Sequence, residues 1–521
     1  MALLEPLDPE LAAMLGFASK HVSKGLLGEL LDWGKRYKPQ SYDEKMQRRR
    51  LYYEGKARGH LERALAARYP ATYMKMSLAQ VNLLRLIADV DASVYDYDPH
   101  RYLVDENGSQ IADIDPATRR FKDHLDDSDL DTVMIEAERR LMIADTIPLR
   151  STWEPLHRHS VLEPWWPSDV WAIPHARHPS NPGYFVSVIA KVAGPDGVQS
   201  STERNRSGKT VGVASSEGRD EQRTCYEVWT REWMHDDEET GAPVFGPWFC
   251  ETVDTQGHST QRQGGAKTPY EGKRLPWVFL QNGIPDGCPW IDRNDELLDA
   301  IDTVLVTLTN IFFLVDMQAH SEKVLQHDGP LKESVPVGPN AFIKIPVESK
   351  LSTLDYNPRI MESLGVVKDY LKTIAISRLQ SEDAYSWERK SPESGVSRRI
   401  KNEPQEKLRR KLARMRKRDE ERYLLPLLIE QANLFGPRGK QIPETYRARM
   451  DPREPPDFED PMQKQQRAQE AEARGHISKA RAAVEAGWYP SLDAAREARL
   501  PTELLAAERG AGSAAGDTED P

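Results

Sequence analysis

Two apolar helices bracket a short insert, and a polar loop and a long basic helix follow; this order constrains the fold most strongly. The first helix is predicted over Asn294–His320 and the second over Arg359–Gln380. In each, hydrophobic residues recur at alternating spacings of four and three, which places them on one stripe of a helix. The stripe residues are Leu297, Ile301, Val304, Leu308, Ile311 and Val315, then Ile360, Leu364, Val367, Leu371 and Ile374.

The segment between the helices, Leu325–Pro358, is predicted to be extended, with a β-like run at Ala341–Val347. The loop after the second helix, Ser381–Gly395, is polar. Several apolar residues outside the stripes need further cover, from either the sheet region of the same chain or a neighbouring subunit. They are Leu305, Phe312, Phe313 and Ile376.

Val396–Phe435 is predicted to be one long helix, with kinks at Pro404 or Pro426, because each proline removes an amide donor. From Arg398 to Arg422 it carries twelve basic and five acidic residues, a net charge of +7. Either the helix packs against acidic groups of this chain or a neighbouring subunit, or some cations face DNA phosphates. The cations are Arg398, Arg399, Lys401, Lys407, Arg409, Arg410, Lys411, Arg414, Arg416, Lys417, Arg418 and Arg422.

Composition narrows the function classes. The net charge of −11 over 521 residues argues against a protein that coats nucleic acid. Cys225, Cys250 and Cys288 have no CxxC spacing, so a reducing folding environment is expected. No signal peptide is expected, and Thr303–Val315 is too short to span a bilayer, so no membrane association is expected.

The regions flanking this core are predicted more coarsely. Residues 1–100 read as helices at Leu11–Phe17, Leu26–Trp33, Asp43–Leu65 and Ser77–Val94, and another helix is predicted over Leu130–Ile147. Arginines and tyrosines at Arg48–Gly55 could contact phosphate, but a solvated helix face with aromatic anchors is the preferred interpretation. An antiparallel sheet is predicted between Pro148 and Trp290. Its strands are Val170–Ile173, Tyr184–Val192, Thr224–Glu232, Trp248–Val253 and Pro276–Leu280.

Candidate enzymatic and metal motifs are incomplete. Ser207–Thr210 resembles the end of a phosphate-binding loop, but Glu203 stands where its first glycine is required. The acidic patch Asp89–Asp98 lacks the glycine and glutamate of a calcium loop, and the histidines at 157, 159, 175 and 178 have no recognised metal spacing. We therefore expect no catalytic residues, no metal and no cofactor, and do not expect an enzyme.

The order of elements resembles the core of the tailed-bacteriophage portal protein, the head-to-tail connector ring. Three local matches accompany it: Tyr52-Tyr53-Glu54-Gly55 after a helix, a proline-containing strand and Asn282-Gly283 ahead of the first core helix, and Ser394-Gly395-Val396 opening the long helix. The resemblance implies an α+β portal-type fold. Its parts would be a mixed α/β wing with an antiparallel sheet (1–292), stem helices (293–322 and 358–380), a small clip (323–357), a tunnel loop (381–395), a long kinked wing helix (396–436), a helical crown (437–510) and a disordered tail (511–521).

The resemblance also implies a function. Twelve copies would form a ring at one capsid vertex of the virion, assembled in the host cytoplasm, with double-stranded DNA passing through during genome packaging and ejection. The ring would dock the large terminase subunit and later the head–tail adaptor and tail proteins, and would contact major capsid and scaffolding proteins. The alternative is a DNA-processing enzyme or accessory subunit that binds DNA through the basic helix 398–422; a third option is a scaffold without DNA contact.

Two sets of site residues follow from the portal resemblance. The DNA channel and tunnel loop would be lined by Trp387, Glu388, Arg389, Lys390, Arg398 and Arg399. The clip residues that dock the terminase or adaptor would be Lys332, Glu333, Glu348 and Lys350.

Overall fold

The computed structural model describes residues 22–68, 77–174, 185–193, 224–236, 243–255, 270–293, 295–319, 323–326, 350–353, 360–381, 395–437 and 441–453. The chain splits into two compact units. The first comprises Met1–Ser386 with Lys407–Arg453, and the second Trp387–Glu406 with Glu454–Pro521. The described residues lie almost entirely in the first unit.

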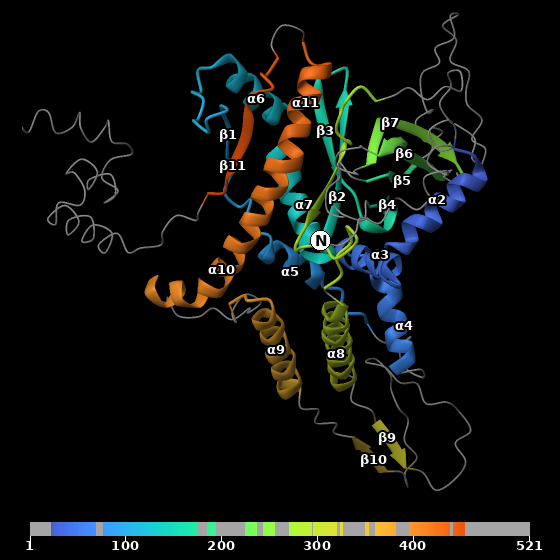
Figure 1. Cartoon of the computed structure of the whole chain (residues 1–521). Coiled ribbons are helices and arrows are strands. Elements are labelled where there is room, and N and C mark those ends of the chain that lie inside the picture. The colour runs from blue at the N-terminus through green and yellow to red at the C-terminus, as the bar shows by residue number, and fades with distance from the viewer. Residues whose placement is uncertain are drawn as a thin grey trace, which may run out of the picture. The chain divides into compact units, whose positions relative to one another are not determined.

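Helices open the described part of the chain (Figure 1). The piece predicted at Leu26–Trp33 is confirmed, but the single charged helix predicted over Asp43–Leu65 is wrong. The chain breaks at Gly55, whose φ of +72° lies in the left-handed region that glycine adopts without strain. The helix predicted over Ser77–Val94 is shorter than expected, because it begins only after the cap Asn82. The observed helices are α2 (Lys24–Arg36), α3 (Tyr42–Tyr53), α4 (Arg58–Arg68) and α5 (Leu83–Asp91).

Two antiparallel sheets form the centre of the first unit, with strand orders β3-β2-β8 and β4-β5-β6-β7. Every pairing among the described strands is antiparallel, so the α+β class with an antiparallel sheet is confirmed. The strands are β2 (Thr146–Glu154), β3 (His159–Pro164), β4 (Val170–Ile173), β5 (Ser187–Ala193), β6 (Thr224–Asp236), β7 (Pro243–Asp254) and β8 (Trp277–Gln281). A 3-10 turn, Pro167–Asp169, precedes β4.

Strand β4 has the predicted bounds, and β5 to β8 are found with shifted ends. The sequence does not predict β2, β3 or α6 (Pro116–Asp127), nor the pairing of β1 (His100–Val104) with β11 (Arg447–Asp451). Helix α7 (Leu130–Ala144) is shorter than predicted, because Asp145 adopts a left-handed conformation with a φ of +59° and the chain turns into β2.

Aromatic residues fill the core between helices and sheets. Trp248 and Trp277 are fully buried. Phe279 meets Phe185 edge to face at 4.7 Å and Trp290 at 5.5 Å between ring centroids, a favoured geometry for aromatic pairs. A smaller apolar cluster lies between α2 and the four-stranded sheet.

The predicted helix pair is confirmed as α8 (Asp295–Ala319) and α9 (Ile360–Ser377), which lie side by side (Figure 1). Between them the structure describes an antiparallel strand pair, β9 (Lys323–Gln326) with β10 (Lys350–Thr353). The predicted β-like run at Ala341–Val347 lies outside the described residues. On the stripes, Ile301, Val304 and Ile374 are buried, but Val315 is exposed.

The prediction that Leu305 needs cover from another subunit is wrong, since Leu305 is 3% exposed within this chain. One turn further on, Thr309 is also buried and accepts a hydrogen bond from the amide of Ala79 at 3.0 Å. The segment before α5 therefore covers this part of α8. Phe312 and Ile376, by contrast, remain about half exposed.

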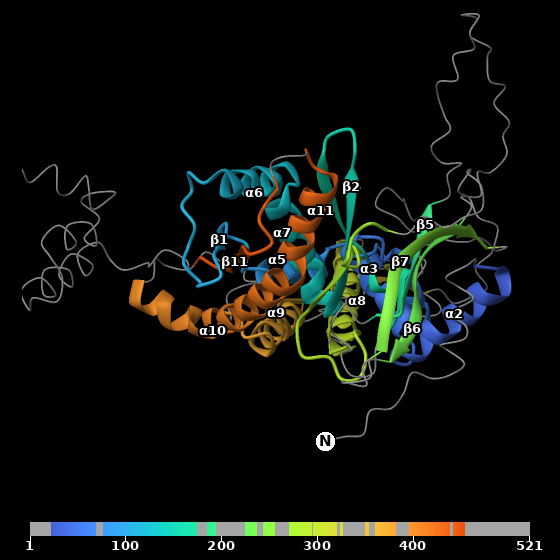
Figure 2. The same ribbon diagram turned by 45° about the horizontal axis from the view of Figure 1, so that its top comes forward.

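The predicted long helix is present as α10 (Gly395–Asp419), a π-helical turn (Glu420–Leu424) and α11 (Leu425–Phe435). Figure 2 shows α11 passing close to β11, with which it is in contact. The π turn lies directly before Pro426, whose missing amide and bulky ring disturb the preceding turn. Pro404, the other predicted kink, lies inside α10.

The arginine run on α3 is an interior ion-pair cluster, so the solvated helix face preferred from the sequence is wrong. Arg49 is 1% exposed and pairs with Asp292 at 2.6 Å. Arg48 pairs with Asp302 at 2.6 Å, and Arg50 with Asp169 at 2.8 Å. Three consecutive arginines thus tie α3 to three different segments.

Within the described residues, one helical stretch, Glu296–Asp316, is long and apolar enough to cross a bilayer by length and composition alone, with a mean hydropathy of 1.8. Its Asp302 is paired with Arg48, and Ile301 and Leu305 are buried against this chain. These contacts favour a core and interface helix.

Replacing Arg49 by methionine should lower the free energy of unfolding by about 3 kcal/mol, because it leaves a buried carboxylate without its main partner. The cost falls at the low end of the usual range, since Lys45 stays 3.0 Å from Asp292. Urea unfolding measures the change, with the exposed Lys35→Met as the matched control. A loss no larger than the control's would contradict the assignment.

Candidate functional site

The residues predicted for the tunnel loop and clip are mostly outside the described residues. This holds for Trp387, Glu388, Arg389, Lys390, Lys332, Glu333 and Glu348. Arg398 and Arg399 lie on α10 and Lys350 on β10, where the structure describes the backbone alone. These assignments stay predictions, as do the portal names given to the segments. The described site candidate is therefore the later part of the long helix.

The long helix divides its cations between the interior and the surface. Arg409 and Arg416 are buried. Arg409 donates to the carbonyl of Ser93 at 2.9 Å, and Lys417 pairs with Asp451 at 2.6 Å. These residues fit the interpretation of a helix packed against groups of its own chain. A second set is exposed: Lys407, Arg410, Lys411, Arg414 and Arg422.

Arg416 fastens the helix to the end of β8. Its guanidinium is 0% exposed, donates to the carbonyl of Gln281 at 3.2 Å and to the side chain of Asn282, and lies 3.5 Å from Asp419. Burial raises the pKa of Asp419, while Arg416 and Arg418 oppose that shift. The helix cannot leave β8 without exposing or unpairing a buried charge.

The π turn is held from the other side by a second buried cluster. Glu420 is 0% exposed and accepts hydrogen bonds from Arg101 and from the hydroxyl of Tyr95, both at 2.6 Å. Glu138 accepts from the amides of Val94 at 3.2 Å and Tyr95 at 3.4 Å. Burial raises the pKa of Glu138 to about 7.

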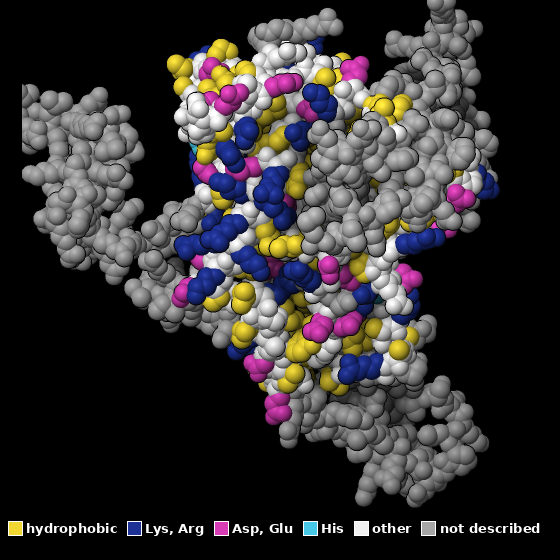
Figure 3. All heavy atoms as spheres, viewed as in Figure 1, with side chains coloured by type: hydrophobic (Ala, Val, Ile, Leu, Met, Phe, Trp, Pro, Cys, Tyr) yellow, Lys and Arg dark blue, Asp and Glu magenta, His cyan; other side chains and the backbone are white. Residues whose placement is uncertain are grey.

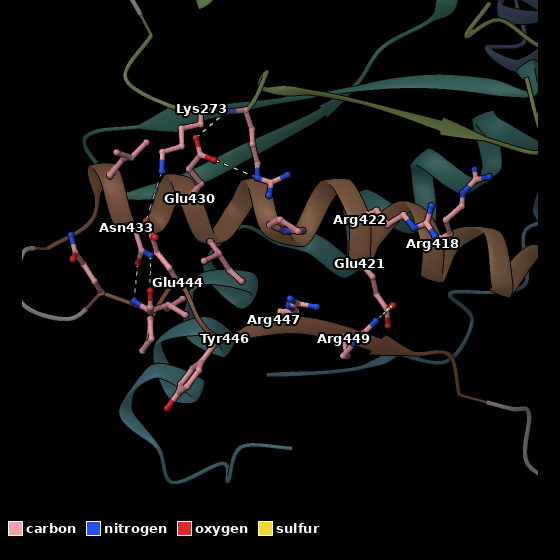
Figure 4. Close-up of a pocket in the computed structure, with 18 of the residues that line it drawn as sticks. Lys273, Arg418, Glu421, Arg422, Glu430, Asn433, Glu444, Tyr446, Arg447 and Arg449 are labelled. Atoms are coloured by element: carbon pink, nitrogen blue, oxygen red, sulfur yellow. Dashed lines mark hydrogen bonds and ion pairs between the residues drawn. The ribbon is translucent and has the colours of Figure 1, made fainter. Parts of the chain in front are cut away.

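An open groove of 1410 Å³ runs beside this anchored helix (Figure 4). Its walls are the segment 271–274, the helix from Arg414 to Leu434, and the segment 441–449. Eight Lys and Arg residues line it against four glutamates, in a chain whose overall charge is −11. The cations are Lys273, Arg274, Arg414, Lys417, Arg418, Arg422, Arg447 and Arg449.

Short-range contacts fix the walls of the basic groove. The side chain of Asn433 exchanges two hydrogen bonds of 2.8 Å with the backbone of Ile442. Glu421 pairs with Arg449 at 2.9 Å. Gly272 approaches Glu430 so closely that an added Cβ would lie 2.7 Å from its carboxylate oxygen. The groove is thus built by contacts between segments far apart in the sequence.

Cations and apolar surface lie together in the groove. Arg414 and Arg447 are exposed, and neither has an ion-pair partner among the described residues. Figure 3 shows Lys and Arg side chains gathered along the later part of α10. The groove also has apolar lining residues, namely Pro426, Ile429, Leu434, Ile442 and Tyr446. Such a surface can bind an anionic partner that also carries apolar groups.

The described part of the chain has no group of His, Cys, Asp and Glu arranged to hold a metal ion. The acidic patch singled out in the sequence serves the fold instead: Asp91 is buried and pairs with Arg378 and Gln380 at the end of α9. His124 is stacked on Trp153 at 5.9 Å, and burial lowers its pKa to about 4.

A second candidate surface is the outer face of α8 and α9. Hydrophobic side chains are exposed there (Figure 3), and nothing in the described part of the chain covers them. They are Phe312, Val315, Met361, Val366, Tyr370 and Ile376.

Sequence reasoning identified the basic helix but missed the opposite wall of the groove. The adjacent pair Lys273-Arg274 and the alternating Arg447 and Arg449 were available signals. Their meaning depends on β11 pairing with β1, which no local pattern predicts.

No protein-family model matches the sequence. No curated protein matches it either. Among solved structures, similar chains come from the neck of an empty gene transfer agent particle (10% identity) and from the virion of a native gene transfer agent particle (11% identity). Each alignment covers 78% of this chain and 88% of the other, with a TM-score of 0.35. A likeness this distant carries no argument about fold or function.

The raised pKa of Glu138 predicts a pH-dependent stability. The folded chain holds a proton that the unfolded chain releases above its ordinary carboxyl pKa, so the free energy of unfolding falls as the pH rises from about 4.5 through about 7. Glu138→Gln should flatten this fall, at about 1.4 kcal/mol per pKa unit removed.

Urea unfolding at pH 5 and pH 7.5 measures the effect, with the exposed Glu62→Gln as control. Asp145, whose pKa burial raises to about 6, contributes in the same window, so some slope persists in the variant. An unchanged slope in Glu138→Gln would show that Glu138 does not titrate there.

Proposed function

We propose that this chain is a portal-type subunit that forms a closed ring, with its two apolar helices as the stem. The order helix, strand pair, helix, loop and long helix supports the proposal. In this assignment the segment 323–357 is a clip that docks the large terminase and later a head–tail adaptor, and 381–395 is a tunnel loop. Capsid and scaffolding proteins would surround the ring at one vertex of the virion.

The observation that carries the proposal is the uncovered apolar face of the helix pair. Met361 is 79% exposed, Val366 65% and Ile376 54%, on helices whose other face is buried in the chain. Contiguous apolar side chains on a soluble surface are typical of an interface between proteins. Identical neighbours on both sides of α8 and α9 would cover this face, which a ring of copies provides.

Charge is consistent with a conduit for double-stranded DNA. A chain with a net charge of −11 repels phosphates from most of its surface, while a few cations guide them. We assign the guiding cations to Arg389, Lys390, Arg398 and Arg399. The protein itself would do no bond chemistry, and the energy for translocation would come from the terminase.

The assembly role of the apolar face can be tested by placing charge on it. Phe312→Asp combined with Ile376→Asp should leave a folded monomer where the wild type forms large assemblies, because two carboxylates would be desolvated in the contact. Sedimentation velocity reports the assembly state, and circular dichroism reports the fold.

The matched control is Leu156→Asp, at a residue 80% exposed in the turn between β2 and β3. It should assemble as the wild type does. Normal assembly of the double variant would remove the ring from this face.

The tunnel-loop assignment predicts that Arg389→Ala with Lys390→Ala impairs DNA packaging while ring assembly stays intact. Packaging is scored as protected DNA in particles assembled with the variant. Wild-type levels of protected DNA would show that these cations do not guide DNA.

The basic groove also favours a second candidate, a DNA-processing enzyme or accessory subunit. Under that reading Arg414→Glu and Arg447→Glu should weaken binding of a DNA duplex, with a salt dependence that decreases by about one ion per lost phosphate contact. Under the portal proposal, binding in free solution is weak and hardly changes. Fluorescence anisotropy over a salt series separates the two.

A further inference from the structure

The basic groove along the long helix has the wrong composition for a duplex backbone. Its cations surround apolar residues, of which Leu434 is 40% exposed. Phosphates and sugars gain little from such a floor, since contacts to the duplex backbone are mainly charge and hydrogen bonds. A protein segment with carboxylates and apolar side chains matches both parts of the groove.

The same chain carries a segment of this composition. Residues 105–115, the acidic loop, contain four acidic residues and no Lys or Arg. Ile114, in the middle of its last acidic stretch, is 75% exposed. The groove has an excess of four positive charges, so loop and groove are complementary in charge, and each offers apolar surface.

Internal hydrogen bonds make the acidic loop a preformed surface. Asp105 accepts from the amides of Asn107 at 2.9 Å and Ser109 at 2.8 Å, and Gly108 turns the chain with a φ of +81°. At the other end, Asp115 caps α6. Glu106 remains exposed, and Asp113 meets only Lys122 at the surface. A preformed loop loses little conformational entropy on docking.

The loop and the groove lie on opposite sides of the β1–β11 pair. One edge of β1 pairs with β11, and its other edge bridges Val104 to Gln110 in the acidic loop. On the far side of β11, the amide of Met450 donates to Glu421 of the π turn, beside the groove. While these pairings hold, the loop faces away from the groove of its own chain.

From this arrangement we propose that the acidic loop of one copy docks into the basic groove of the next copy. Two different patches on separate sides of one subunit form a head-to-tail contact, which repeats and closes into a ring when the rotation permits. This inference rests on the ring proposed above and names a second contact, independent of the α8–α9 face. Glu106 and Asp113 would meet Arg414 and Arg447, with Ile114 against the apolar floor.

Charge reversal on either side tests the contact. The groove variant is Arg414→Glu with Arg447→Glu, and the loop variant is Glu106→Lys with Asp113→Lys. All four positions are exposed, so the fold should be kept. Each variant alone should raise the concentration needed for half-assembly about tenfold or more, equivalent to 1.4 kcal/mol.

A mixture of the two variants should restore assembly, because every loop then meets a groove of opposite charge in an alternating ring. The cis combination of all four changes should assemble for the same reason. Sedimentation velocity at low and high salt measures each sample. The matched control, Lys35→Glu with Arg63→Glu, makes the same charge change at exposed sites elsewhere and should assemble normally.

Wild-type rings with unimpaired single variants would overturn the loop-to-groove contact and leave the ring proposal standing. Loss of assembly that the mixture does not rescue would also overturn it. Loss of duplex DNA binding by the groove variant, with assembly unchanged, would assign the groove to nucleic acid instead. A wild type that never assembles would overturn both proposals.

Discussion

The buried guanidinium of Arg416 is the constraint on which the described structure most depends. It lies 3.5 Å from Asp419 and donates to Gln281, where β8 ends. A buried charge that loses its partners is costly, whereas one that keeps them fixes position more than it adds stability. The pair therefore specifies where the helix crosses the sheet.

Other features follow from that position. Glu420, held by Arg101 and Tyr95, fastens the π turn that Pro426 makes necessary. With the helix fixed on this side, its opposite face forms one wall of the basic groove, and β11 supplies the other. The same helix is thus interior ion pair on one face and charged surface on the other, which joins the two interpretations that its sequence left open.

The helix pair and the long helix could be predicted from sequence because both depend on local periodicity. A stripe at spacings of four and three is readable without knowing its partner, and the observed bounds of α8 and α9 lie within three residues of those predicted. Strand β4 was equally readable, as a short apolar run between turn residues. Charge, by contrast, was read poorly: Arg49 sits in a hydrophilic run and yet is buried. Its partner Asp292 lies far away in the chain, and no local pattern connects the two.

The groove was beyond sequence reasoning for the same reason. Arg447 becomes part of it because β11 pairs with β1, and Gly272 because it fits against Glu430. Pairings across such distances carry a loop-closure cost that only the assembled core repays, so they leave no local signature. The acidic loop, readable as charge alone, acquires meaning only when its side of β1 is known.

The central claim is that this chain is a ring subunit, and the mass and symmetry of the purified protein test it most directly. Native mass spectrometry with negative-stain imaging should find closed rings near twelve copies around a central hole. A monomer that persists at high concentration and at every salt concentration would contradict the claim, and the exposed face of α8 and α9 would then need another partner.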